Sequence, residues 1–80
     1  MIRQEDIKVG MEITFGDISR TRGIYLVVKG LIDLFEDSVG TVEYVGNEPL
    51  FDMATYMAND CQCFYFDEDE IDGIEVGFYG

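Results

Sequence analysis

The richest source of metal ligands in the sequence is an acidic run, Asp67-Glu68-Asp69-Glu70-Ile71-Asp72-Gly73. Carboxylate oxygens are the ligands that Ca²⁺ prefers. If Gly73 takes the sixth position of an EF-hand loop, the twelfth falls on Tyr79, where a bidentate Glu is required. The neighbouring segments also alternate like strands rather than helices. The sequence therefore excludes an EF-hand and leaves two interpretations, a solvated acidic turn or weak, nonspecific divalent binding.

The two thiols, Cys61 and Cys63, are the other candidate metal ligands. A structural zinc site needs about four Cys or His ligands, and the chain has no histidine to complete one. Residues two apart on a strand point to the same face, which disfavours a disulfide between these cysteines. We expect free, partly buried thiols with a structural role, and neither a metal site nor another cofactor.

Catalytic groups are scarce. Without histidine the chain lacks the usual general base near neutral pH, and it cannot form a Ser-His or Cys-His nucleophile pair. Two carboxylates would suit a glycosidase-type mechanism, but eighty residues leave little wall for a deep substrate cleft. The glycines near the end of the sequence have acidic neighbours that would repel phosphate. We expect a protein that is not an enzyme.

Alternating apolar residues predict the elements that carry these side chains. The expected strands are 11–15, 24–28, 41–45, 61–66 and 74–78. The second is apolar on both faces, so we expect it at the centre of the sheet. In the fourth, Phe64 and Phe66 are expected on one face, with Cys61, Cys63 and Tyr65 on the other.

One short helix is expected over residues 49–59, because Pro49 suits the first turn of a helix. A polar turn is expected over 17–23, and one irregular helical turn around Leu34 and Phe35. The predicted fold is a single α+β domain over residues 1–80, with a small antiparallel sheet or SH3-like barrel of about five strands.

Three stretches resemble the small SH3-like barrels: Lys8-Val9-Gly10-Met11-Glu12-Ile13-Thr14-Phe15, Val39-Gly40-Thr41-Val42-Glu43-Tyr44-Val45 and Tyr65-Phe66-Asp67-Glu68-Asp69-Glu70-Ile71. In that family a short helical turn separates the last two strands. The resemblance covers about half of the chain and implies a closed barrel. The helix expected over 49–59 departs from the simplest version of that fold.

The distribution of charge is the strongest functional signal. The chain has 5 basic and 17 acidic residues, a net charge of −12. All five basic residues and four of the acids fall in residues 1–29, whereas residues 30–80 hold the other thirteen acids and no base. This division indicates an electrostatic partner. The alternatives are an acidic surface that serves solubility, or adaptation to high salt, which should spread acids along the whole chain.

The candidate partner-binding residues are the acids of the run and those expected to extend the same face. They are Asp67, Glu68, Asp69, Glu70, Asp72, Glu75, Glu43, Asp33, Glu36 and Asp37. Duplex DNA carries one negative charge per about 1.7 Å of its axis, so a net charge of −12 corresponds to roughly 20 Å of duplex. Such a surface would fit a basic cleft that normally binds nucleic acid.

In length, charge and lack of catalytic groups, the chain resembles the small acidic inhibitors made by bacteriophages and mobile elements. These include DNA-mimic anti-restriction and anti-CRISPR proteins. The resemblance implies a basic partner, a nucleic-acid-binding enzyme or complex, and no direct binding of nucleic acid. Three alternatives remain: an assembly module of a phage particle or larger complex, an acidic antitoxin or immunity protein, and an enzyme subunit whose acids position a metal with a partner chain.

No export signal or membrane segment is expected. The first residues are polar and acidic, and no apolar signal region follows them. The longest uninterrupted apolar run, Ile24 to Val28, is too short to span a bilayer. We therefore expect a cytoplasmic protein, in the host cell if a phage encodes it, that does not bind membranes.

Overall fold

The computed structural model describes residues 2–48 and 60–66, together with the backbone of residues 75–78. In chain order the elements are η1 (Gln4–Asp6), β1 (Glu12–Thr14), α1 (Phe15–Ser19), β2 (Tyr25–Lys29), β3 (Val39–Gly46), β4 (Cys61–Tyr65) and β5 (Glu75–Phe78). The helix expected over 49–59 lies outside the described residues. The fold is α+β, and the described residues form a small antiparallel sheet with one short α-helix.

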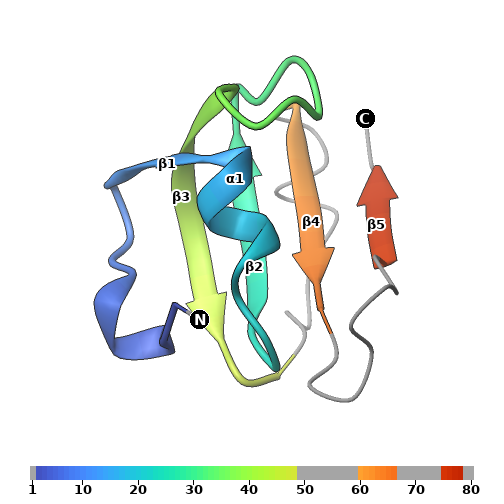
Figure 1. Ribbon diagram of the computed structural model, residues 1–80. Coiled ribbons are helices and arrows are strands. Elements are labelled where there is room, and N and C mark those ends of the chain that lie inside the picture. Colours follow the sequence, from blue (N-terminus) through green and yellow to red (C-terminus); the bar gives the residue numbers. More distant parts are fainter. Residues whose placement is uncertain (1, 49–59, 67–74, 79–80) are drawn as a thin grey trace.

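The sheet has the strand order β1-β3-β2-β4-β5, and every neighbouring pair is antiparallel. Figure 1 shows α1 lying across one face of the sheet. Among the described strands, β1 and β5 stand at opposite edges and do not pair with each other, so the sheet is open. Closure into an SH3-like barrel stays a prediction.

Strand β2 lies between β3 and β4, as its apolar sequence predicts. Leu26, Val27 and Val28 are at most 2% exposed, which confirms that both faces of this strand are covered. Successive side chains of a strand point to opposite faces. Leu26 and Val28 belong to the main core cluster, while Val27 lies on the other face, in register with Tyr44 and Cys63.

The main core is formed by buried apolar side chains from the sheet, α1 and the segments beside them. Its members are Ile7, Ile13, Ile18, Ile24, Leu26, Val28, Leu31, Val42, Phe64 and Phe66. Phe64 and Phe66 are buried together, as the alternation of the 61–66 segment predicts. The ring of Phe15 in α1 lies 6.0 Å from that of Phe64, tilted by 57°, which joins the helix to the sheet.

The start of α1 corrects the sequence prediction for this region. The expected strand over 11–15 ends at Thr14, and α1 takes in residues 17–19, the first part of the turn expected over 17–23. The Thr14 hydroxyl accepts a hydrogen bond from the backbone N–H of Asp17 at 3.1 Å, a side-chain cap of the first turn. The alternating pattern of residues 11–15 predicts a strand to Phe15, but the cap at Thr14 ends the strand and begins the helix one residue earlier.

Residues 30–38, called the β2–β3 loop below, also differ from expectation. No helical turn forms there. The loop instead accepts the first two backbone N–H groups of α1: Phe15 donates to the Ser38 carbonyl at 2.7 Å and Gly16 to the Glu36 carbonyl at 2.9 Å. A helix leaves its first N–H groups without partners inside the helix. The loop carbonyls therefore provide hydrogen-bond acceptors for the first turn of α1.

The β2–β3 loop is fixed at further points. Leu31 is buried in the main core, and its carbonyl accepts a hydrogen bond from the Gln62 side chain of β4. The Ser38 N–H donates to the Phe35 carbonyl at 2.9 Å and closes a tight turn. A Cβ at Gly16 would lie 2.6 Å from Cγ of Glu36, so a glycine at that position lets the loop approach α1 closely. The backbone of this loop is therefore well anchored.

No helix within residues 2–48 or the other described segments is both long and apolar enough to cross a membrane.

Candidate partner-binding surface

The β2–β3 loop carries three of the acids predicted to bind a partner. Asp33, Glu36 and Asp37 are all exposed. The nearest basic residue along the chain is Lys29, the last residue of β2, and it forms no ion pair with them. No described basic side chain neutralises these three carboxylates, so they present uncompensated negative charge to the solvent.

The same loop exposes large apolar side chains between its acids. Ile32 is 91% exposed, Phe35 70% and Leu34 41%. Leu34 and Phe35 lie where the sequence predicts a helical turn, and their types and spacing predict no functional role. The signal available in the sequence was the interleaving itself, since Ile32 to Asp37 alternates apolar and acidic side chains without a regular period.

The structure does not bring all the predicted acids to this loop. Glu43 is half-buried at an irregularity of β3, where the register against β2 shifts. Glu75 begins β5 opposite Tyr65, at the other end of β4 from Gln62, which contacts the loop. The side chain of Glu75 lies outside the description.

The predicted binding residues of the acidic run, Asp67, Glu68, Asp69, Glu70 and Asp72, all lie outside the described residues. Their role stays a prediction from the sequence.

The arginines of the N-terminal half contact groups of their own chain. Arg20 forms an ion pair with Asp17, and this hydrogen bond is the main cause that lowers the pKa of the Asp17 carboxyl. Arg22 donates to the carbonyls of Ser19 and Thr21 at 2.7 and 2.6 Å.

The remaining arginine contacts are also internal. The guanidinium of Arg22 lies 5.6 Å from the centre of the Phe66 ring, and Arg3 lies 3.4 Å from Glu5. The three arginines are thus engaged in contacts with their own chain.

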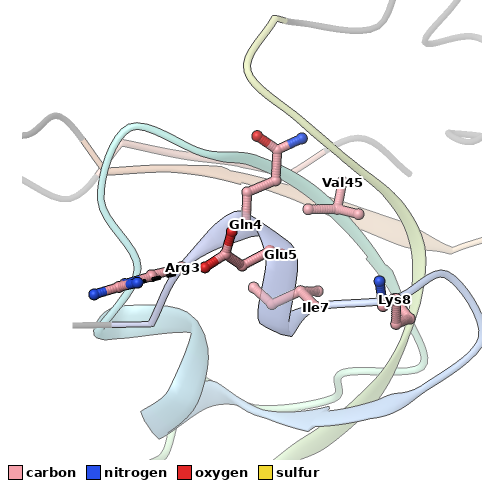
Figure 2. Close-up of a pocket in the computed structure, with 6 residues that line it drawn as sticks. All are labelled: Arg3, Gln4, Glu5, Ile7, Lys8 and Val45. Carbon is pink, nitrogen blue, oxygen red and sulfur yellow. Dashed lines mark hydrogen bonds and ion pairs between the residues drawn. The ribbon is translucent and has the colours of Figure 1, made fainter.

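A shallow hollow of about 410 Å³ lies beside η1 and β3. Figure 2 shows its lining residues: Arg3, Gln4, Glu5, Ile7, Lys8 and Val45. Its single carboxylate, Glu5, is paired with Arg3. The hollow therefore lacks the two carboxylates that acid–base hydrolysis of a glycoside requires.

Neither cysteine forms a disulfide; Cys61 is buried and Cys63 half-buried. Burial raises the pKa of the Cys63 thiol to about 11. The pKa of the Cys61 thiol is also raised, mainly by burial and secondly by the negative charge of Glu43. The thiolate is the reactive form of cysteine, so neither side chain is prepared for nucleophilic attack at neutral pH. Within the described part of the chain, no three His, Cys, Asp or Glu residues gather as a metal site.

Iodoacetamide should therefore alkylate Cys63 slowly in the folded chain. Unfolding returns the pKa of the thiol to about 8.5, so at about pH 8 the rate in urea should rise at least about tenfold. Mass spectrometry of a Cys61→Ser variant isolates this thiol. Equal rates in the folded and unfolded chain would contradict the raised pKa.

The same shift predicts how stability depends on pH. The folded state holds the Cys63 proton more tightly, so its contribution to stability is complete below the unfolded pKa. That contribution is lost as the pH rises toward the folded pKa of about 11.

The β2–β3 loop combines exposed carboxylates with exposed apolar side chains. No family model, curated protein or solved structure matches this chain. Carboxylates attract basic groups, and exposed apolar side chains gain free energy when a partner buries them.

Proposed function

We propose that this chain is a binding protein that presents an acidic surface to a basic, nucleic-acid-binding site of a partner protein. It would act in the cytoplasm of the host cell as a phage-type anti-defence inhibitor and DNA mimic. The observation that carries the proposal is the β2–β3 loop, where Asp33, Glu36 and Asp37 are exposed and form no ion pair with a described basic residue.

The exposed apolar residues of the loop argue against an acidic surface that serves solubility alone. Solubility is improved by replacing exposed apolar side chains with charged ones, and a loop selected only for solubility would not expose Ile32 and Phe35. Interfaces between proteins combine an apolar centre with a polar rim. The composition of the loop is the one that such an interface needs.

Net charge supports the DNA-mimic form of the proposal. A charge of −12 equals that of roughly 20 Å of duplex, enough to occupy a basic groove. The acids of the run, with Glu43 and Glu75, would extend this surface. We also propose that the sheet closes into an SH3-like barrel. The register shift between β2 and β3 supports closure, because a β-bulge increases the bend and twist of a strand.

A displacement experiment tests the function. Immobilised duplex DNA is loaded with the DNA-binding proteins of a bacterial extract and eluted with the chain. Particular proteins should be released in complex with the chain, and the affinity should fall steeply as salt rises, because exposed charges are screened within about 8 Å at 0.15 M ionic strength.

Polyglutamate of equal charge is the control for nonspecific displacement, and the chain itself should not bind the DNA. The proposal fails if polyglutamate releases the same proteins equally well. It also fails if the affinity of the released protein does not change with salt.

A further inference from the structure

The β2–β3 loop places three large apolar side chains in the solvent within four successive positions. Ile32, Leu34 and Phe35 are 91%, 41% and 70% exposed in the folded chain. Single exposed apolar residues are normal on a protein surface, whereas a contiguous group is typical of an interaction site. The hydrogen bond from the Ser38 N–H to the Phe35 carbonyl fixes the backbone at one end of this group.

The backbone that carries these side chains is held before any partner arrives. Leu31 anchors one end in the main core, and the carbonyls of Glu36 and Ser38 accept hydrogen bonds from α1 at the other. Binding through a fixed loop costs less conformational entropy than binding through a loop that must be ordered. The exposed side chains are thus presented on a preorganised support.

The charge of the loop selects the kind of surface that would cover it. Asp33, Glu36 and Asp37 alternate with the apolar residues, so any occupant brings its own groups close to three carboxylates. A second copy of this chain would oppose three further carboxylates, and its net charge of −12 would add long-range repulsion. An anionic lipid surface or nucleic acid would be repelled in the same way. A basic protein surface is attracted.

We infer that the β2–β3 loop is an apolar anchor that inserts into a hydrophobic depression rimmed by Lys or Arg on the partner protein. Ile32 and Phe35 fill the depression, while Asp33, Glu36 and Asp37 meet the rim. This inference rests on the proposed function and adds to it a contact that salt does not screen. Tight interfaces commonly depend on a few such anchors near the centre, surrounded by contacts that exclude water.

Two synthetic peptides of equal length and charge provide the probe. One carries Lys and Leu in an amphipathic helical pattern, and in the other every Leu is replaced by Ser. The wild-type chain should bind the Lys/Leu peptide more tightly, and the double variant Ile32→Ser with Phe35→Ser should lose about tenfold in that affinity, which corresponds to ~1.4 kcal/mol. Its affinity for the Lys/Ser peptide should not change.

Val9→Ser is the matched control, because Val9 is 64% exposed in the turn before β1 and carries no role in the inference. This variant should bind both peptides as the wild type does. Equal melting temperatures of all three proteins would show that the exposed substitutions leave the fold intact.

The outcomes separate this inference from the function on which it rests. Unchanged Lys/Leu affinity of the double variant overturns the anchor, while salt-dependent binding of both peptides still supports the acidic surface. If the wild-type chain binds neither peptide at low salt, the proposed function itself fails. A wild-type dimer in sedimentation that the double variant abolishes would assign the loop to a second copy and overturn the inference.

Discussion

Phe64→Ala is expected to lower the free energy of unfolding by about 3–5 kcal/mol. Phe64 is 1% exposed, lies opposite Leu26 of β2 and packs against Phe15 of α1. Removing its ring leaves a cavity between the helix and the sheet that neither element can fill without moving. A chain of 80 residues has a total stability of about 4–12 kcal/mol, so this loss is a large part of the whole.

Phe35→Ala is the matched control, since it removes the same ring from a side chain that is 70% exposed. Its effect should stay within about 0.5 kcal/mol, as for most surface substitutions. Urea denaturation of both variants measures the difference. Equal losses would mean that Phe35 contributes to the core, which would contradict both the burial of Phe64 and the availability of Phe35 for a partner.

The parts of the fold that the sequence predicts well are those where burial decides the pattern. Residues 24–28 are apolar on both faces, and β2 is the covered central strand. Phe64 and Phe66 alternate with more polar neighbours and are buried together. Burial of these positions is driven by the hydrophobic effect, and it can be predicted from the pattern of apolar residues in the sequence.

The parts that differ depend on contacts between segments distant in sequence. Thr14 caps α1 through its hydroxyl, but the helix also needs the carbonyls of Glu36 and Ser38, which no local pattern reveals. The spacing of Leu31, Leu34 and Phe35 suited a helical turn, yet only Leu31 enters the core. A helical spacing of apolar residues predicts a helix only if those residues are buried on one face, and Leu34 and Phe35 are exposed.

The candidate site divides in the same way. The sequence predicts Asp33, Glu36 and Asp37 as binding residues because they lie in the half of the chain that has no basic residue, and their role stays a prediction. The sequence could not show that these acids share a fixed loop with exposed Ile32 and Phe35. That arrangement follows from the docking of the loop against α1, a tertiary contact.

Charge reversal should have the largest effect on binding. The double variant Asp33→Lys with Asp37→Lys is expected to weaken binding to the partner released from DNA. The expected loss of binding free energy is several kcal/mol, as for the loss of close charge pairs at an interface. Both side chains are exposed and form no ion pair with a described residue, so stability should not fall. Titration calorimetry across a salt series measures the affinity, and thermal melting measures the fold.

Asp69→Lys with Glu70→Lys tests the acidic run in the same assay and should weaken binding by a similar amount. The run holds five carboxylates in six positions, from Asp67 to Asp72, without a basic residue. Reversal should leave the fold intact or slightly more stable, because it relieves repulsion between like charges. If this variant destabilises the fold while each folded molecule binds as before, the run is structural and does not contact the partner.

The double variant Glu12→Lys with Glu48→Lys tests whether binding depends on the β2–β3 loop or only on net charge. It changes the net charge by the same amount as the loop variant, at exposed acids outside the candidate set. Long-range attraction should weaken modestly, and the difference from wild type should shrink at high salt, where distant charges are screened. The loop variant should keep its deficit there, because close pairs at an interface are screened much less. Equal losses in the two variants at every salt concentration would mean that the partner senses only the overall charge, and the β2–β3 loop would then have no special part in binding.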